Sequence, residues 1–375
     1  MKNIRYFFVE TRLIASLQIA LTIVCLLLAT FIHAQVPQGY YSAAENKSGE
    51  ELRTAMYNII KSHDTLSYDG ELWQAFYTTD VRPDNSKVWD MYSDQPGAEP
   101  AYYYSFGSDQ CGNYHNEGDC YNREHSVPKS WFGGSVSPMY TDLFHLVPTD
   151  GYVNSRRSDF PFGKVVNSTW TSTNGSKLGT SNIAGYSGKV FEPIDSFKGD
   201  FARIYFYMAV CYMDKNLGVE TKSNFSGGDL KPWAKELLLQ WAALDPVSQK
   251  EIDRNNAVHQ IQHNRNPFVD YPELAEMIFG NNTDIAFHTT IPAYFDKNVW
   301  SLYPNPATSS IQIQSSYNQQ NIKTIEIADI TGKVFLHKTI NDDHALLDVS
   351  FLSHGIYLLT ITSEQDIHTY KIVKQ

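Results

Sequence analysis

A carboxylate and an imidazole are adjacent at Glu124 and His125, in a segment that continues to Pro128. A neutral imidazole, with an unperturbed pKa of ~6.5, can take a proton from water near neutral pH. Carboxylate oxygens are the ligands that hard divalent cations prefer. A single Glu-His pair is common, however, and a lone histidine is more often structural. The pair therefore indicates chemistry only if further groups join it.

Two such groups follow at Asn154 and Arg157, whose spacing of three residues places both on one face of a helix. The pattern over 121–157 predicts a strand, a connection, a second strand, a turn at 148–149 and a short helix capped by Thr149 or Asp150. Phosphodiester hydrolysis needs a base, a cation and a positive donor for the phosphate. His125, an ion held by Glu124 and Asn154, and Arg157 can supply these three.

The motifs carrying these residues resemble the bacterial endonuclease I family, a group of ββα-metal nucleases. The resemblance covers about 39–282 and is most specific at 123–128, 142–148 and 153–158. It implies cleavage of DNA, and often RNA, with little sequence specificity, using Mg²⁺ (Mn²⁺ or Ca²⁺ are alternatives) and leaving 5′-phosphate ends. It also implies that His125 is the general base and that Glu124 and Asn154 are metal ligands. Arg157 matches an arginine that contacts phosphate or supports the helix.

The sequence departs from the family pattern at several positions. Phe144 replaces a histidine found in many relatives, and His145 either orients His125 or belongs to the core. A phosphate-contacting arginine of some relatives lies on an insertion that this chain lacks. The candidate replacements that bind substrate are Arg123, Arg156 and Arg265. The polar cluster over 262–266 either locks a helix to the core or lines the substrate groove.

The net charge of −11, from 30 Lys+Arg against 41 Asp+Glu, argues against a protein that coats nucleic acid. It does not exclude an enzyme, because a hydrolase needs only a local cationic site and a metal ion can provide much of that charge. Two rival functions remain: a non-catalytic surface protein that binds extracellular DNA, and a phosphodiesterase for smaller substrates. We expect the protein to be a monomer and to need no small-molecule cofactor.

The N-terminus has a basic start followed by an apolar run over 13–32 and a small residue at Ala34. This pattern predicts a signal peptide over 1–34. The alternative is a transmembrane anchor, since the run approaches the ~20 residues that span a bilayer. The protein is therefore expected to be secreted, extracellular or at the cell surface.

Cysteine usage fits an oxidising exterior. Cys111 and Cys120 flank a short flexible loop and are expected to form a disulfide. A zinc site with His115 as a third ligand is the alternative, although it lacks a fourth ligand at normal spacing. Cys211 lies in an apolar stretch and is expected to be a buried free thiol.

Helices are expected over 48–63, 151–157, 199–214, 229–241, 247–264 and 273–279. Ser48 with Glu51, and Ser248 with Glu251, have capping-box spacing. The segment 167–188, rich in Ser, Thr, Asn and Gly, is expected to be a surface excursion. These elements predict an α+β fold, with a ββα-metal nuclease core and surrounding helices, for a catalytic domain over 39–290.

The character changes near residue 300. Short alternating strands are expected over 311–314, 324–329, 334–339, 346–349, 357–362 and 369–374, which predicts a small all-β sandwich over 300–375. The motifs at 303–306, 329–333, 355–357 and 371–375 resemble the C-terminal sorting domain of type IX secretion cargo. This implies recognition by outer-membrane secretion machinery. The alternative is an accessory sandwich that binds carbohydrate or DNA.

Overall fold

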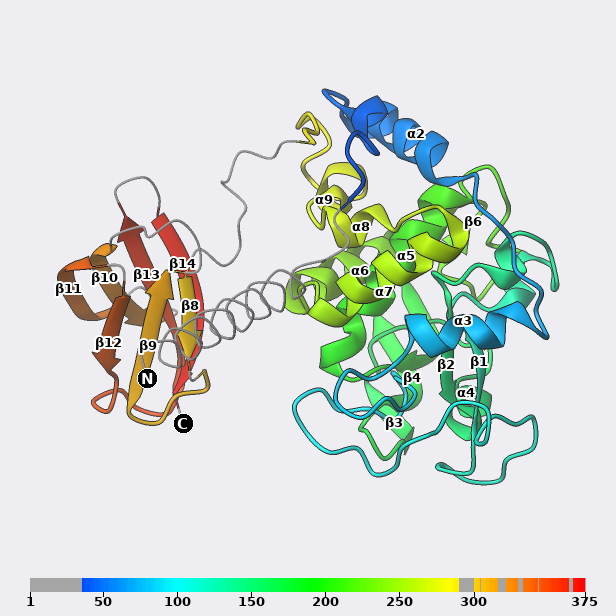
Figure 1. Cartoon of the computed structure of the whole chain (residues 1–375), viewed down its shortest axis with the longest axis horizontal. Coiled ribbons are helices and arrows are strands. Elements are labelled where there is room, and N and C mark those ends of the chain that lie inside the picture. The colour runs from blue at the N-terminus through cyan, green and yellow to red at the C-terminus, as the bar shows by residue number, and fades with distance from the viewer. Residues whose placement is uncertain are drawn as a thin grey trace, which may run out of the picture. The chain divides into compact units, whose positions relative to one another are not determined.

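A computed structural model of the chain describes residues 36–289, 300–303, 305–315, 322–329, 333–342, 344–363 and 367–374. The expected signal peptide over 1–34 lies outside these residues. The chain divides into two compact units, Met1–Thr289 and Thr290–Gln375, which are described separately (Figure 1). No helix among the described residues has the length and apolar character needed to cross a membrane.

The core of the first unit is built around helix α5 (Lys198–Cys211), in which every residue after Lys198 is buried. A helix that is apolar on all sides must be covered on all sides. Helices α2 (Gly49–Ile60), α6 (Pro232–Leu244) and α8 (Pro267–Asp270) pack against it, and α7 (Gln249–Gln262) and α9 (Leu274–Ile278) are further helices of this unit (Figure 1). The expected helices are thus all present, with ends shifted by a few residues.

Capping explains where two of these helices begin. Ser248 and Glu251 form the full capping box at the start of α7, as expected. Ser48 occupies the N-cap position of α2, but its side chain makes no capping hydrogen bond, so the second expected capping box is wrong. Short 3₁₀ helices cover Ser42–Ala44, Lys129–Phe132, Met139–Thr141 and Asp195–Phe197.

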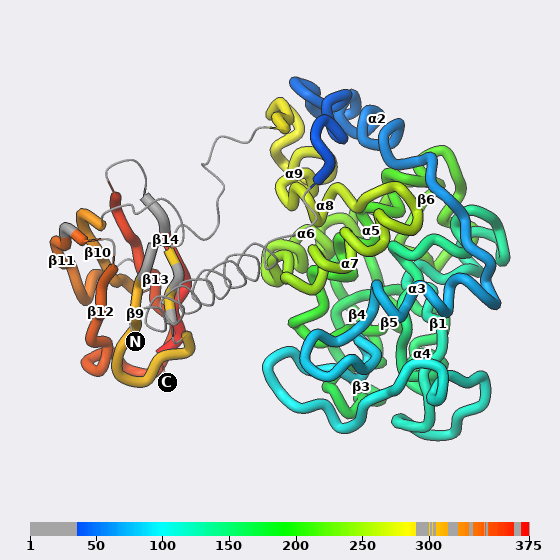
Figure 2. Tube along the Cα trace, viewed as in Figure 1, coloured from blue at the N-terminus to red at the C-terminus, as the bar shows by residue number. Residues whose placement is uncertain are grey.

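Helix α3 (Glu71–Thr79) was not expected from the sequence. Ser67 and Glu71 exchange two hydrogen bonds at its start. Trp73 reaches from α3 to the ring of Tyr121 on strand β1 (Tyr121–His125), with 5.7 Å between ring centroids. The long irregular connection from α3 to β1 is visible in the Cα trace (Figure 2). It brings side chains such as Tyr92 into contact with β1.

Strand β1 pairs in antiparallel register with β2 (Leu146–Asp150), and helix α4 (Gly151–Arg157) follows without a connecting loop. This is the expected ββα unit. Residues 148 and 149 belong to β2, so the expected turn at that position is wrong. Asp150 accepts a hydrogen bond from the backbone N–H of Val153 at 2.8 Å and therefore caps α4, one of the two residues expected to do so.

The segment 167–188 forms most of a three-stranded antiparallel sheet instead of an irregular excursion. Its strands are β3 (Asn167–Thr171), β4 (Lys177–Ile183) and β5 (Tyr186–Glu192), and a two-stranded ribbon of β6 (Phe225–Ser226) and β7 (Asp229–Leu230) lies elsewhere in the unit. Strands β4 and β5 bury Leu178, Val190 and Phe191, and these few apolar residues among many polar ones gave only a weak strand signal in the sequence.

Cys111 and Cys120 form the expected disulfide, nine residues apart in sequence. Cys211 is a free and buried cysteine, also as expected. Because both sulfur atoms are in the disulfide, Cys111 and Cys120 have no thiolates to bind zinc, and the alternative of a zinc site is wrong.

The second unit is an antiparallel sandwich. One sheet has the order β11 (Val334–Asp342), β10 (Ile322–Asp329), β13 (Gly355–Ser363) and β14 (Ile367–Lys374), and the other has β12 (His344–Asp348), β9 (Ser310–Ser315) and β8 (Trp300–Tyr303). Alternate side chains from both sheets form its own core, including Ile311, Ile325 and Leu359. All six expected strands are present; β8 was not expected.

Candidate active site

The hairpin and α4 determine which side chains meet. Glu124 pairs with Val147 and His125 with Leu146 across the hairpin. Because α4 starts directly after β2, its inner face returns along β1. Asn154 and Arg157, three residues apart on that face, both contact β1. The helical spacing read from the sequence therefore places Asn154 and Arg157 against the strand that carries Glu124 and His125.

Glu124 is buried, and one oxygen of its carboxylate is held by two donors. The Tyr92 hydroxyl donates to Oε1 at 2.7 Å, and Arg157 Nη1 donates to the same oxygen at 2.8 Å. Burial raises the pKa of Glu124, while Arg157 and Tyr92 oppose that rise. Both contacts fall on Oε1, so Oε2 is the oxygen left to meet a cation.

Asn154 lies on α4, which faces strand β1, and its side-chain amide nitrogen makes hydrogen bonds to that strand. Nδ2 donates to Asn122 Oδ1 at 2.7 Å and lies 3.3 Å from the backbone oxygen of Arg123. The side-chain oxygen of Asn154 therefore points away from these two partners. An amide oxygen and a carboxylate oxygen on facing elements are a donor set that suits a hard divalent cation.

His125 is buried beside the same strand end. Its Nε2 lies 3.0 Å from the backbone oxygen of Tyr140. A carbonyl only accepts, so Nε2 carries the hydrogen and Nδ1 has the free lone pair. The Tyr140 ring is stacked on the imidazole at 5.2 Å with a 19° interplanar angle. Burial, assisted by the charges of His145, Lys129 and Arg123, lowers the pKa of His125 to about 3.

His145 is a core histidine next to His125, with 5.5 Å between the ring centroids. Its Nε2 contacts the backbone oxygen of Met139 at 2.5 Å, which anchors the loop before β2. Phe144 packs on Tyr207 at 4.6 Å, so it takes no polar part in the site.

Arg157 was expected to contact phosphate or to support the helix, and its placement corresponds to support. Its side chain is fully buried. Besides Glu124, it donates to the backbone oxygens of His125 at 3.0 Å and Ser126 at 2.5 Å. Burial lowers its pKa, but the charge of Glu124 more than compensates and the pKa is raised. A guanidinium so enclosed cannot reach a nucleic acid.

Arg265 does not line the site either, which corrects the expectation that it binds substrate. It is buried, and its Nε and Nη2 donate to the two carboxylate oxygens of Asp270 at 2.7 Å each. Gln262 of the same cluster accepts from the backbone N–H of Leu143 at 2.6 Å. The 262–266 cluster locks the end of α7 to the core, the first of its two expected roles.

Arg123 and Arg156 remain partly accessible. Arg123 is held between the rings of Tyr68 and Trp73, with 3.6 and 4.4 Å from its Cζ to their centroids. Its edge lines a pocket of about 340 Å³ that Asn122 also lines. Arg156 lies over the Trp170 ring at 5.3 Å. Arg123 also donates to the Tyr68 backbone oxygen and pairs with the exposed Asp69 at 3.3 Å, so both guanidinium groups lie near the hairpin and only part of each is accessible.

Four further residues near the site were not expected from the sequence: Tyr92, Asn122, Lys129 and Tyr140. Asn122 precedes the Glu-His pair by two residues, and strand periodicity places it on the same face as Glu124. That alternation was the available signal. Tyr92 comes from the long connection before β1 and Tyr140 from the 3₁₀ helix between β1 and β2, and no local pattern predicted their contacts.

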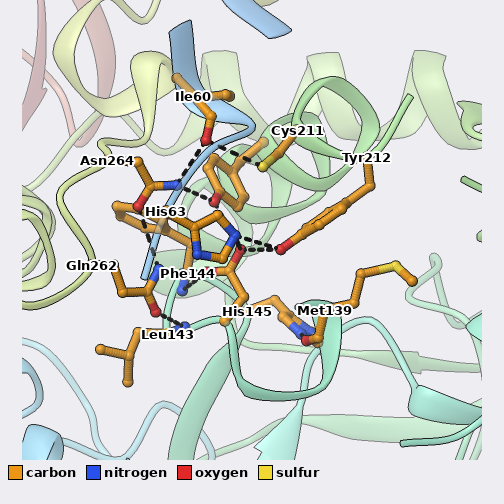
Figure 3. Close-up of polar contacts among 12 residues, drawn as sticks. Ile60, His63, Met139, Leu143, Phe144, His145, Cys211, Tyr212, Gln262 and Asn264 are labelled. Carbon is orange, nitrogen blue, oxygen red and sulfur yellow. Dashed lines mark hydrogen bonds and ion pairs between the residues drawn. The ribbon is translucent and has the colours of Figure 1, made fainter. Parts of the chain in front are cut away.

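A second polar cluster joins His63, Asp142 and Cys211, whose ligand atoms lie within 4.8 Å of one another (Figure 3). The hydroxyls of Tyr207 and Tyr212 donate to Asp142 Oδ2 at 2.8 and 2.7 Å. His63 Nε2 lies 2.9 Å from the Tyr212 hydroxyl. These atoms are engaged in hydrogen bonds that join the loop before β2 to α5, and we assign no ion to the cluster.

Comparisons with known proteins match both units. A family model described as Endonuclease I matches residues 48–273, and one described as Secretion system C-terminal sorting domain matches residues 301–375. The chain is 36% identical to a protein named Extracellular ribonuclease of Bacillus subtilis (strain 168) over 247 residues, which are 64% of this chain and 78% of that protein. A protein of that name from Bacillus amyloliquefaciens gives the same identity and shares.

A protein named Endonuclease-1 of Buchnera aphidicola subsp. Baizongia pistaciae (strain Bp) is 31% identical over 163 residues, covering 39% of this chain and 60% of that protein. The sorting-domain match makes this chain a secreted or cell-surface protein.

Proposed function

Because this chain belongs to the endonuclease I family and is a secreted nuclease, we propose that it is a metal-dependent endonuclease that hydrolyses DNA and RNA with little sequence specificity. The observation that carries the proposal is the meeting of α4 with β1. Asn154 contacts the backbone next to Glu124, and His125 follows directly in the strand.

His125 is proposed as the general base. With Nε2 committed to the Tyr140 carbonyl, Nδ1 is the atom that accepts a proton. Burial lowers the pKa of His125, so the imidazole is neutral at pH 7 and Nδ1 has a lone pair that can take a proton. Water loses a proton to Nδ1 as its oxygen bonds to phosphorus. The bond from phosphorus to the 3′ oxygen then breaks, the 3′ oxygen leaves with the electron pair and takes a proton from solvent, and the other product carries a 5′-phosphate.

Glu124 Oε2 and Asn154 Oδ1 are proposed to hold Mg²⁺, with Mn²⁺ or Ca²⁺ as alternatives. The donor set fits, because it consists of one anionic and one neutral oxygen on two elements that are rigidly joined. When bound, the cation would neutralise charge that develops on the phosphate and the leaving oxygen. The protein's own contribution is to hold the two oxygens in place: Arg157 and Tyr92 fix the carboxylate, and Asn122 contacts the amide.

Substrate recognition is proposed to use backbone phosphates. Arg123, Arg156 and Lys129 are cations near the hairpin, and phosphate contacts carry no sequence information. Because water is the nucleophile, a 2′-hydroxyl is not required, and both DNA and RNA can be cleaved. The overall charge of −11 is consistent with an enzyme that attracts its substrate locally and releases it.

The domain organisation belongs to the same proposal. We assign 1–34 as a signal peptide, 39–290 as the catalytic domain and 300–375 as the sorting domain that outer-membrane secretion machinery recognises. A monomer without a small-molecule cofactor is the proposed working form.

A digestion assay tests the function. Supercoiled plasmid and a long RNA are incubated with wild type and His125→Ala, with Mg²⁺ and with EDTA. We expect cleavage of both substrates, loss with EDTA, and at least a ~10²-fold loss with His125→Ala. His337→Ala, which removes an exposed histidine of the second unit paired with Glu326, is the matched control.

Two results would overturn the proposal. Binding of plasmid without any cleavage by the wild type would favour a non-catalytic DNA-binding protein. Cleavage of dinucleotides but not of long DNA or RNA would favour a phosphodiesterase for small substrates. Circular dichroism of each variant shows whether a loss of activity reflects a loss of fold.

A further inference from the structure

The orientation of the Asn154 amide follows from its partners. The backbone oxygen of Arg123, 3.3 Å away, can only accept a hydrogen bond. The side-chain atom that faces it must therefore be the amide nitrogen. The amide oxygen then points in the other direction, where a cation would sit. This assignment does not depend on distinguishing oxygen from nitrogen by their positions alone.

The shorter of the two hydrogen bonds comes from Asn122. Its Oδ1 accepts from Asn154 Nδ2 at 2.7 Å, against 3.3 Å for the Arg123 carbonyl. Asn122 pairs with Thr149 across the hairpin, one residue before the cap of α4. It is thus anchored in the strand pairing and is only half-buried. Because strand pairing fixes the backbone of Asn122, its side chain is well placed to orient the Asn154 amide.

Two pairs of side chains, which we call clamps, join α4 to β1. Arg157 contacts Glu124, and Asn154 contacts Asn122, so residues three apart on the helix meet residues two apart on the strand. In the first clamp the helix residue orients the strand residue's carboxylate. In the second the strand residue orients the helix residue's amide. Each clamp leaves one oxygen free, Glu124 Oε2 and Asn154 Oδ1.

We infer that Asn122 is a positioning residue for the metal site: it keeps the Asn154 oxygen, instead of the nitrogen, facing the cation. The inference rests on the proposed function, in which Asn154 is a metal ligand. Without Asn122, only the long contact to Arg123 opposes rotation of the amide. Rotation would present an N–H group to the cation and remove a ligand. Partners of metal ligands typically change metal affinity 10–100-fold when removed.

A fold-only role for Asn122 predicts a different result. Helix α4 is already fixed by the Asp150 cap and by the buried bonds of Arg157 to His125 and Ser126. Loss of the Asn122 contact should therefore leave the melting temperature nearly unchanged. The effect should fall on the metal.

The experiment measures Mn²⁺ affinity of the full chain by titration calorimetry and by the EPR signal of free Mn²⁺, without substrate. The variants are Asn122→Ala, Asn122→Asp, Asn154→Ala and the double variant Asn122→Ala/Asn154→Ala. Asn182→Ala, an exposed asparagine on β4, is the matched control. We expect Asn122→Ala to weaken Mn²⁺ binding about tenfold. Asn122→Asp keeps an acceptor oxygen and should bind at least as well as wild type.

The double variant separates the explanations. If Asn122 acts through Asn154, the double variant binds Mn²⁺ no more weakly than Asn154→Ala alone. Additive losses, or an unchanged affinity in Asn122→Ala, would refute the positioning role. An unchanged affinity in Asn154→Ala would instead remove the proposed ligand itself. Thermal melting of each variant accompanies the titrations, and a loss of folded protein in Asn122→Ala alone would favour the structural role.

Discussion

Arg157 and Glu124 form an ion pair in which both side chains are buried, with 2.8 Å between Nη1 and Oε1. The guanidinium is also bonded to two backbone oxygens of the strand that carries Glu124 and His125. Arg157 therefore supports the site from the protein interior. It sets the orientation of the carboxylate and the path of the strand end, and it does not reach the solvent where a substrate would bind.

Replacing Arg157 by methionine should destabilise the protein strongly. Breaking a buried ion pair by removing one partner typically costs about 3–5 kcal/mol, because the other charge stays buried and unpaired. Urea unfolding of wild type and Arg157→Met measures this loss. An arginine used only for phosphate contact predicts the opposite pattern, with unchanged unfolding and reduced cleavage.

Lys129 should bind substrate phosphate. It is exposed, its Nζ lies 5.6 Å from the Tyr140 ring, and its charge helps to lower the pKa of His125. Lys129→Ala should reduce kcat/KM for long DNA several-fold and should lower the slope of log affinity against log salt by about 1. Lys338→Ala, an exposed lysine of the second unit, is the control. Equal salt slopes for wild type and Lys129→Ala would contradict the assignment.

Lys250 should make stability depend on alkaline pH. Burial lowers its pKa to about 8, and nearby Asp80 only partly opposes this effect. Between pH 8 and 10.5 the unfolded chain holds this proton while the folded chain has lost it, so folding becomes more favourable as the pH rises. Below pH 8 both states are protonated, and the cost of burying the ammonium is fully present.

The variant Lys250→Met removes this titration. Wild type should gain stability relative to the variant between pH 8 and 10.5, by at most ~3 kcal/mol. The hydrogen bond from Nζ to the Thr79 carbonyl is lost in the variant at every pH, and its dependence on the charge of Nζ is already part of the lowered pKa of Lys250. Denaturant unfolding of both proteins at pH 7, 9 and 10.5 measures the difference. A gap that is constant with pH would disprove the lowered pKa.

The disulfide between Cys111 and Cys120 should stabilise the folded state by about 3 kcal/mol, the chain-entropy value for so short a loop. Cys111→Ser/Cys120→Ser should therefore melt at a lower temperature than wild type. Dithiothreitol should lower the melting temperature of wild type to that of the double variant and leave the variant unchanged. If reductant affects both proteins equally, the bond contributes nothing to stability.

Much of the fold could be predicted from periodicity. The apolar pattern over 199–214 and the capping residues Ser248 and Glu251 indicated helices that the structure contains. Alternation likewise indicated six of the seven strands described in the second unit, all except β8. The prediction failed at β3–β5 and at α3. In β3–β5 the polar composition concealed a weak strand signal, and in α3 the mixed aromatic spacing concealed a weak helix signal. Packing against the rest of the chain decided the conformation of both.

The candidate site divides in the same way. Local sequence placed the carboxylate and the imidazole next to each other on one strand and the amide on the helix that packs against that strand, because strand adjacency and helical spacing are properties of short segments. Only the tertiary structure decided what each arginine does, because burial depends on residues far away in the chain. Arg157 and Arg265 are buried, whereas Arg123 and Arg156 keep part of their side chains accessible. The contact of Tyr92 with Glu124 likewise comes from a loop far away in the chain, whereas Tyr140 meets His125 from the 3₁₀ helix that lies between β1 and β2.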